Sequence, residues 1–368
     1  MTIGLLKEPA HETRVSLLAE AVATLTKKGI TVLVESDAGA KAFCSNADYE
    51  KAGAQVKSRA DVLAADIVLG IHQPSMDEIS KLKSKVAIGV FQPLFNVDTM
   101  KQWATAGVTS FSLDMLPRTT RAQAMDVLSS QANIAGYKAV LTAANSYGRY
   151  FPMFMTAAGS IAPAKVLILG AGVAGLQAIA TAKRLGAVVE VFDTRPAVKE
   201  EVMSLGAKFV EVEGAADASK AGGYAVEQSE DFMQRQKAKI AESIAKADIV
   251  ITTAQIPGKK APILITEEMI KAMRNGSVII DIAAATGGNT PVTKNNETVN
   301  YNGVSIIGNS SLQSTMPSDA SKVYGKNVLN FLALIITKEG TINLNWEDDL
   351  VKGSCVTHDG NIVHERVK

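Results

Sequence analysis

The sequence predicts an α/β protein with two doubly wound, Rossmann-like domains, whose parallel sheets are linked by two long helices. Short apolar runs alternate with helix-like segments along most of the chain, which is the pattern of parallel β-α-β units. The stretches 123–147 and 317–337 have helical patterns long enough to leave one domain and reach another. The chain has 368 residues, which is typical of two domains.

The composition argues against several classes of protein, among them nucleic-acid-binding, disulfide-rich, metal-binding and membrane-spanning proteins. Apolar residues make up 47% of the chain and charged residues 20%, as in globular proteins with substantial cores. The net charge of +1 gives no electrostatic reason to expect nucleic acid as a partner. The two cysteines, Cys44 and Cys355, are too few for a disulfide framework, and the four histidines lack metal-binding spacing, so we expect no metal. Neither a signal peptide nor a membrane-spanning apolar stretch is recognisable.

The first domain is expected to comprise residues 1–130 and to be completed by residues 318–368. The tail alternates apolar and polar residues on both sides of a turn at 357–360, which favours two further strands. Apolar runs predict strands at 3–6, 30–35, 66–71, 86–91 and 107–113. Helical patterns predict helices at 16–28, 48–53, 60–65 and 97–106.

The second domain is expected to span residues 131–317. The polar stretch 217–236 interrupts its apolar runs, and we interpret it as a lid over a ligand; a surface loop without function is the alternative. Six strands are predicted, at 165–169, 188–192, 208–211, 249–253, 278–282 and 304–307.

A glycine-rich turn in the second domain indicates dinucleotide binding. The strand at 165–169 runs directly into GAGVAG at 170–175, a G-x-G-x-x-G pattern, and a helical segment follows. The next strand, 188–192, ends on Asp193. Because strand, turn, helix, second strand and acid occur in the required order, we interpret this stretch as an NAD(H) site.

Each residue of this pattern has a physical role. Gly170 permits the tight turn, Gly172 lets the backbone approach a pyrophosphate, and Gly175 allows close packing of helix and strand. Asp193 is placed to accept hydrogen bonds from the adenosine ribose, and its charge would repel a 2′-phosphate, although Arg195 lies nearby. Expected nucleotide contacts in this domain are Gly170, Gly172, Val173, Gly175, Asp193, Thr194, Arg195, Thr253 and Gln255.

Five long motifs follow one another along the chain. They are KEPAHETRV at 7–15, PRTTRAQAMDVLSSQANIAGYKAV at 117–140, GAGVAGLQAIATAKRLGAVVEVFDTRP at 170–196, TTAQIPGKKAP at 252–262 and GSVIIDIAAATGGN at 276–289. Together they resemble the alanine dehydrogenase and pyridine nucleotide transhydrogenase superfamily, over almost the whole chain. The resemblance is greatest to the NAD(H)-binding α subunit (domain I) of proton-translocating NAD(P) transhydrogenase.

The resemblance implies a second group of site residues. In the family, the loop that corresponds to 118–126 holds the nicotinamide half of the nucleotide, so Arg118, Gln123 and Asp126 are the expected catalytic residues. Helix capping is the alternative role of this group. Further expected contacts are Thr119, Thr120, Arg121 and Ser129, together with Gly223 and Tyr224 in a loop similar to the family's mobile loop.

Two departures distinguish the chain from alanine dehydrogenases. Those enzymes use a lysine in a V-K-E-P stretch, where this chain has IHQP at 71–74. They also carry a catalytic histidine near the following strand, where this chain has VFQP at 90–93. Oxidation of an amino acid needs a positioned base. His72 remains open as a substitute base or a structural residue, and Arg14 as a cleft residue or a structural charge.

The resemblance therefore implies direct hydride transfer between NAD(H) on this chain and NADP(H) on a partner. The implied partners are a second copy of the chain, an NADP(H)-binding domain III and a membrane domain II that translocates protons. The chain would then lie in the cytoplasm, peripherally on the inner membrane face. A soluble NAD-dependent alanine dehydrogenase and a non-catalytic NAD(H)-binding regulatory subunit are the alternatives.

Overall fold

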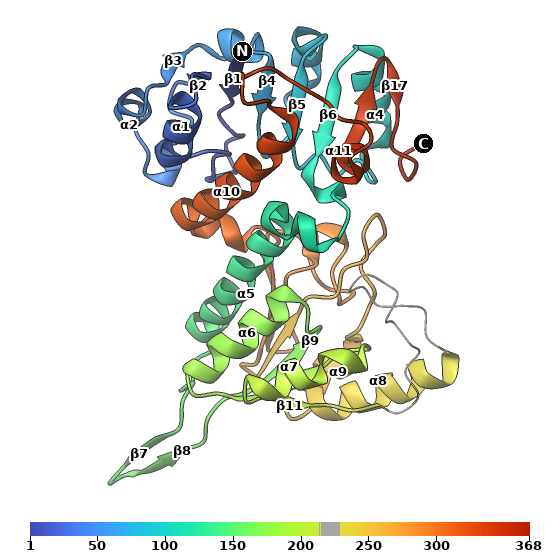
Figure 1. Cartoon of the computed structure of the whole chain (residues 1–368). Coiled ribbons are helices and arrows are strands. Elements are labelled where there is room, and N and C mark those ends of the chain that lie inside the picture. The colour runs from blue at the N-terminus through green and yellow to red at the C-terminus, as the bar shows by residue number, and fades with distance from the viewer. Residues whose placement is uncertain (213, 215–228) are drawn as a thin grey trace. The chain divides into compact units, whose positions relative to one another are not determined.

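The computed structural model describes residues 1–212, 214 and 229–368. These residues form two compact units (Figure 1). Unit 1 comprises Met1–Gln131 and Ser314–Lys368, and unit 2 comprises Ala132–Gln313. Unit 1 is therefore built from the two ends of the chain.

An eight-stranded sheet forms the centre of unit 1, in the order β17-β16-β6-β5-β4-β1-β2-β3. The six neighbouring strands from β6 to β3 in this order are parallel. From the tail, β16 pairs antiparallel with β6, and β17 pairs antiparallel with β16. The strands are β1 (Thr2–Leu5), β2 (Thr31–Glu35), β3 (Gln55–Lys57), β4 (Ile67–Leu69), β5 (Val86–Gly89), β6 (Thr109–Ser112), β16 (Cys355–His358) and β17 (Asn361–Ile362).

Alternating apolar side chains bury both faces of this sheet. In β4, Ile67 and Leu69 belong to one core, which also contains residues of α1 and α10, and Val68 belongs to the other core, with residues of α3 and α4. Burial on both faces is characteristic of parallel sheets. The helices of this unit are α1 (Ala19–Thr26), α2 (Asn46–Lys51), α3 (Arg59–Leu63), α4 (Val97–Thr105), α10 (Pro317–Ile335) and α11 (Asp349–Ser354).

A seven-stranded sheet forms the centre of unit 2, in the order β11-β10-β9-β12-β13-β15-β14. Its six parallel strands have the 3-2-1-4-5-6 order of a dinucleotide-binding sheet, and β14 is antiparallel at the edge. The strands are β9 (Lys165–Leu169), β10 (Val188–Phe192), β11 (Lys208–Phe209), β12 (Ile249–Thr252), β13 (Val278–Asp281), β14 (Glu297–Tyr301) and β15 (Val304–Gly308).

Helices cover both faces of this sheet as well. One core contains residues of α5, α6 and α7, and the other contains residues of α8 and α9. Helix α5 runs across the boundary between the units, at Gln131 and Ala132, whereas α10 lies wholly in unit 1. The helices are α5 (Val127–Ser146), α6 (Val173–Arg184), α7 (Lys199–Ser204), α8 (Glu230–Ile244) and α9 (Glu267–Lys271).

A separate two-stranded hairpin projects from unit 2 (Figure 1). It consists of β7 (Phe154–Thr156) and β8 (Gly159–Ile161), and every residue of both strands is exposed. The segment 150–163 contains no charged residue. Met153 and Met155 are 64% and 70% exposed, so the hairpin presents apolar side chains to solvent.

The predicted α/β class with Rossmann-like parallel sheets is confirmed. Of the two long helices predicted to link the domains, α5 crosses the boundary between the units, but α10 does not, because both of its ends lie in unit 1. Several other predicted elements differ in detail. The helix expected to begin at Gln123 begins at Val127, because residues 120–125 form a 3₁₀ turn. The described end of the expected insertion, residues 230–236, belongs to helix α8. No strand was predicted for β3, β7, β8 or β14. Within the described residues, no helix combines the length and apolarity needed to cross a membrane.

Candidate functional site

The glycine-rich turn of unit 2 closes tightly between β9 and α6. Gly170 has a φ of +105°, a conformation that glycine adopts readily, and its N–H donates to the carbonyl of Phe192 at 2.8 Å. The Thr253 hydroxyl donates to the Gly170 carbonyl at 3.2 Å, which joins the turn to the end of β12. A Cβ atom at Gly175 would overlap the Gly170 carbonyl oxygen, so helix and turn are in direct backbone contact.

The amino end of α6 is open at Gly172. This residue precedes Val173, the first residue of the twelve-residue helix, and no side chain caps it. A Cβ atom at Gly172 would meet no atom of the described residues within 4 Å, so these residues leave space outside the turn. Free backbone N–H groups and the positive end of the helix dipole are what an anionic pyrophosphate requires. The geometry of this turn therefore fits the predicted nucleotide contact.

Asp193 follows the last residue of β10 and lies beside the glycine turn. Its Oδ2 accepts a hydrogen bond from the N–H of Ala171 at 2.7 Å. Arg195 pairs with the same carboxylate, at 2.7 Å between Nη2 and Oδ2, and the carboxylate raises the pKa of the guanidinium. Thr194 is the residue between them. The predicted ribose acceptor is thus in place, and its carboxylate already holds partners from the protein.

The ends of β12 and β13 complete this edge of the sheet. Thr253 and Gln255 follow β12, and the Gln255 amide donates to the carbonyl of Ile282 at 3.3 Å. The predicted residues of unit 2 that are described therefore follow the carboxyl ends of β9, β10 and β12, which are neighbours in the sheet. Doubly wound sheets bind their ligands at the carboxyl ends of the strands. Gly223 and Tyr224, the two predicted contacts in the expected lid, lie outside the described residues.

Asn289 belongs to this edge but was not predicted. Its side chain is fully buried, and its amide donates to the carbonyls of Ala254 at 2.9 Å and Pro262 at 2.8 Å. The loop after β12 is thereby fixed to the end of β13. Sequence reasoning had no signal for this role, because an asparagine after G-G resembles an ordinary turn residue.

The second predicted group lies in unit 1, in the loop before α5. Arg118, Thr119, Thr120, Arg121 and Gln123 are all exposed. Arg121 is held by ion pairs with Asp348 and, at 3.3 Å, with Asp349. Asn327 and Asn330 of α10 both donate to the carbonyl of Ala124, at 2.8 and 2.9 Å, so the loop backbone has a defined position.

Asp126 caps the amino end of α5. One carboxylate oxygen accepts the backbone N–H of Ser129 at 2.8 Å, and the other accepts the Ser129 hydroxyl at 2.6 Å. The capping role that the sequence left open is therefore present. Each carboxylate oxygen retains acceptor capacity, so capping does not prevent a further contact with a ligand.

A buried ionic cluster lies near the carboxyl ends of β1 and β4. The Arg14 guanidinium donates twice to Glu12, at 2.9 and 2.7 Å, and once to Gln131 at 2.8 Å. His72 Nε2 lies 2.9 Å from Glu12 Oε2. Burial opposes ionisation of Glu12, but hydrogen bonds from Arg14 and His72 outweigh it and lower its pKa. Both open candidates, Arg14 and His72, thus contact Glu12, which sequence reasoning had not singled out.

A carboxyl group of opposite behaviour lies beside this cluster. Burial raises the pKa of Glu8, although the backbone N–H groups of Ile71 and His72 donate to its carboxylate. A cavity of about 480 Å³ adjoins Glu8 and His72. Within its lining, Arg59 forms ion pairs with both Glu35 and Glu78. No anion-binding role therefore follows for Arg59.

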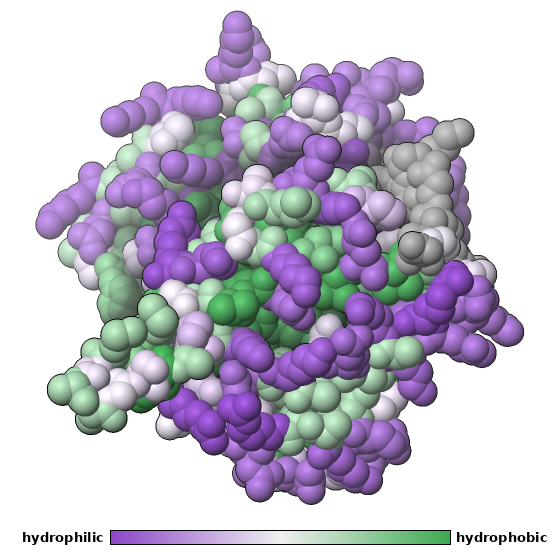
Figure 2. Space-filling model, turned by 90° about the horizontal axis from the view of Figure 1, so that it is seen from below, coloured by the Kyte–Doolittle hydropathy of each residue, from purple (hydrophilic) through white to green (hydrophobic). Residues whose placement is uncertain are grey.

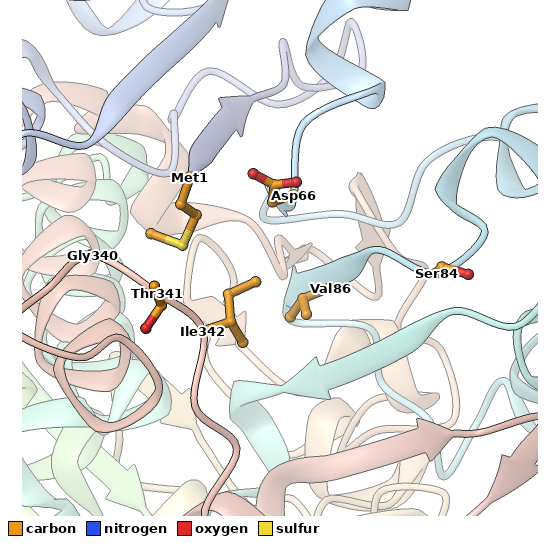
Figure 3. A pocket seen from close by; sticks show the side chains of 7 residues that line it. All are labelled: Met1, Asp66, Ser84, Val86, Gly340, Thr341 and Ile342. Carbon is orange, nitrogen blue, oxygen red and sulfur yellow. The ribbon is translucent and has the colours of Figure 1, made fainter.

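A smaller hollow of about 300 Å³ lies at the amino ends of the strands in the sheet of unit 1 (Figure 3). Met1, Asp66 and Val86, which begin or directly precede strands β1, β4 and β5, line it. The Asp66 carboxylate already accepts hydrogen bonds from the N–H and the hydroxyl of Thr2. Because ligands of doubly wound sheets bind at the carboxyl ends of strands, this hollow is not a candidate site.

The strand order, glycine turn and acidic strand end define unit 2 as a dinucleotide-binding domain of the Rossmann type. Two family models match the chain: "Alanine dehydrogenase/PNT, N-terminal domain" over residues 4–135 and "Alanine dehydrogenase/PNT, C-terminal domain" over residues 139–365. The chain belongs to this alanine dehydrogenase/pyridine nucleotide transhydrogenase family, whose members are NAD(H)-binding and dehydrogenase-like.

Similar proteins divide into two groups. The chain is 44% identical to an NAD(P) transhydrogenase α-subunit protein of Rhodospirillum rubrum, over 96% of this chain and 95% of that protein. A solved structure of transhydrogenase from Sinorhizobium meliloti matches with a TM-score of 0.87 and 42% identity, over 99% of both chains. An L-alanine dehydrogenase structure matches with a TM-score of 0.82 and 26% identity, over 100% of this chain and 98% of that one. The predicted resemblance to the transhydrogenase α subunit is confirmed.

Proposed function

We propose that this chain is the NAD(H)-binding subunit of a transhydrogenase, and that hydride passes directly between NAD(H) on this chain and NADP(H) on a partner subunit. The identity of 44% to a transhydrogenase α subunit, over nearly the whole of both chains, is the observation that carries the proposal. The coupling to proton translocation, through a membrane component that also ties this chain to the membrane, is part of the same proposal.

The residues of the chain support direct transfer. Hydride transfer between two nicotinamide rings moves no proton, so it requires close approach and fixed orientation rather than a general base. Unit 2 offers one glycine turn and one ribose-accepting carboxylate, which suits a single nucleotide on this chain. In our proposal Arg118, Gln123 and Asp126 contact the nicotinamide half, and the residues at the edge of unit 2 hold the adenosine and pyrophosphate.

The ionic cluster of unit 1 disfavours the alanine dehydrogenase alternative. His72 lies in the stretch where those enzymes have the lysine and is paired with Glu12, while the stretch 90–93 (VFQP), near which those enzymes carry the histidine, contains none. Amino-acid oxidation requires a base that takes a proton from nitrogen. The chain thus has neither of the residues on which that reaction depends in its relatives.

A reconstituted exchange assay tests the proposal. The purified chain is mixed with a purified NADP(H)-binding domain III, NADH and acetylpyridine adenine dinucleotide, with bound NADP(H) as the shuttle. We expect the analogue to be reduced only when both proteins are present. Oxidation of L-alanine by the chain alone would instead establish an amino-acid dehydrogenase. NADH binding without either activity would favour a regulatory subunit.

We further propose that the chain is a homodimer that uses the exposed hairpin. A two-stranded hairpin is marginally stable in water, β7 and β8 expose apolar side chains, and the segment 150–163 contains no charged residue. Figure 2 shows this segment as the pale green and white lobe at the left, with little purple. Pairing with a second copy would cover these side chains and the free strand edges.

Charges on the hairpin should dissociate the dimer. We expect the 38.8 kDa chain to sediment as a dimer and the variant Met153→Glu/Met155→Glu to sediment as a monomer, because dimerisation would bury both new charges. The matched control is Met203→Glu/Met233→Glu, which changes two exposed methionines of α7 and α8. A monomeric parent chain, or a dimer that survives both changes, would contradict the proposal.

A further inference from the structure

The carboxylate of Asp193 is already saturated with hydrogen bonds from the protein. Oδ1 accepts the backbone N–H of Arg195 at 2.8 Å and its Nε at 2.9 Å. Oδ2 accepts the N–H of Ala171 at 2.7 Å and Nη2 of Arg195 at 2.7 Å. A carboxylate offers about four acceptor positions, and all four are in use. A ribose diol that approaches this carboxylate finds no acceptor position open.

Two of the four donors belong to the backbone and cannot leave. The N–H of Ala171 is fixed by the glycine turn, and the N–H of Arg195 follows the chain directly after β10. The other two belong to the Arg195 guanidinium, which ends a side chain with several rotatable bonds. The side chains of Asp193 and Arg195 are only 6% and 16% exposed, so the pair is largely shielded from water. Of these donors, only the guanidinium can move away and leave its two acceptor positions on Asp193 to a ligand.

We propose that the Asp193–Arg195 pair is an internal latch on the adenosine ribose site. The inference rests on the proposed binding of NAD(H) by unit 2. In the ligand-free chain the Arg195 guanidinium occupies the ribose-accepting positions of Asp193. NAD(H) binds when its two ribose hydroxyls replace the two guanidinium hydrogen bonds.

The same pair should disfavour NADP(H), which carries a phosphate on the 2′-oxygen of the adenosine ribose. A phosphate on the 2′-oxygen cannot donate to Asp193 and is repelled by its charge, while Arg195 is neutralised by the carboxylate beside it. Removal of the carboxylate would release the Arg195 guanidinium from these two hydrogen bonds at the same place. Guanidinium groups bind phosphate oxygens in a two-pronged geometry. In this proposal Arg195 could bind a phosphate, but its hydrogen bonds to Asp193 occupy the guanidinium.

A four-variant binding experiment tests this latch. Dissociation constants for NADH and NADPH are measured by calorimetric titration for the parent chain and for Arg195→Met, Asp193→Ser and the double variant. Arg195→Met should tighten NADH binding about tenfold, because the internal competitor is gone and the side-chain stem remains. Asp193→Ser should weaken NADH and tighten NADPH, each about tenfold. The double variant should lose the gain in NADPH affinity.

Another ion pair of unit 2 provides the control. Arg274 pairs with Asp248 at 3.2 Å, and Asp248 precedes β12 at the amino end of the sheet. Arg274→Met should leave both affinities unchanged. Circular dichroism of each variant verifies that it is folded.

The outcomes separate this inference from the proposed function. If Arg195→Met weakens NADH binding, or if NADPH affinity stays unchanged in Asp193→Ser, the latch is wrong although NADH binding by the parent chain stands. If the folded parent chain binds no NADH, the proposed function fails first.

Discussion

Replacing Gly172 with alanine should abolish tight NADH binding and leave the free energy of unfolding almost unchanged. The backbone of Gly172 has φ −77° and ψ −169°, which alanine adopts without strain, and its Cβ would enter space that the described residues leave open. That space is the position from which a pyrophosphate would approach the backbone. We expect a loss of affinity of about 100-fold, or about 2.7 kcal/mol.

The matched variant Gly175→Ala should have the opposite signature. Its Cβ would overlap the Gly170 carbonyl oxygen, so helix α6 and the turn would have to separate. Overpacking of this kind costs about 1–3 kcal/mol of folding free energy, and binding falls because the turn is distorted. Titration of NADH fluorescence together with urea denaturation measures both quantities. Normal NADH affinity in Gly172→Ala would remove the glycine turn from the proposed site.

Replacing Glu12 with glutamine should destabilise the chain by about 3–5 kcal/mol at neutral pH. The Glu12 side chain is 3% exposed and carries the charge that balances Arg14. Glutamine leaves the guanidinium buried and without its anion, although it keeps the size of the side chain. Urea denaturation measures the change. Glu20→Gln is the matched control, because Glu20 is exposed and its ion pair with Lys322, at 3.6 Å, lies on the surface. This change should alter the free energy of unfolding by less than about 0.5 kcal/mol.

The contribution of Glu12 should also depend on pH in a definite direction. Its pKa in the folded chain is below the ordinary value of 4.5, so the unfolded chain binds the proton more readily. The contribution is present in full above pH 4.5 and is lost as the pH falls below that value. The parent chain should lose its advantage over Glu12→Gln on acidification. A stability difference that stays constant to low pH would contradict the role of the ion pair.

The sequence predicted the centre of each sheet better than its edges. Strands β9, β10, β12 and β13 are apolar and β-branched because they are buried on both faces, so they can be recognised locally. Strand β14 (ETVNY) is largely exposed, and no apolar run marks it. The hairpin was missed for a related reason, since its apolar residues belong to none of the hydrophobic cores of the described residues, so no core imposes a pattern on them.

The candidate site was predictable where chemistry follows the order of the chain. The glycine turn and Asp193 are separated by one helix and one strand, so their spacing carries the information. Glu12 and Asn289 could not be found in this way, because their partners His72 and Pro262 are brought to them by the fold. The occupation of Asp193 by Arg195 was also hidden, since it depends on a side-chain rotamer.

The tail of unit 1 has a consequence for synthesis of the chain. Strand β6 pairs with β16, and the hydrogen-bonded hydroxyls of Ser110 and Thr357 are 247 residues apart in sequence. A ribosome must therefore complete all of unit 2 before the neighbour of β6 emerges, and unit 2 can fold first. Until then β6 is an open strand edge, the part of a nascent protein most exposed to wrong pairing. Residues 355–368 lie far from the glycine turn in sequence. By covering β6, they protect the first hundred residues from wrong strand pairing.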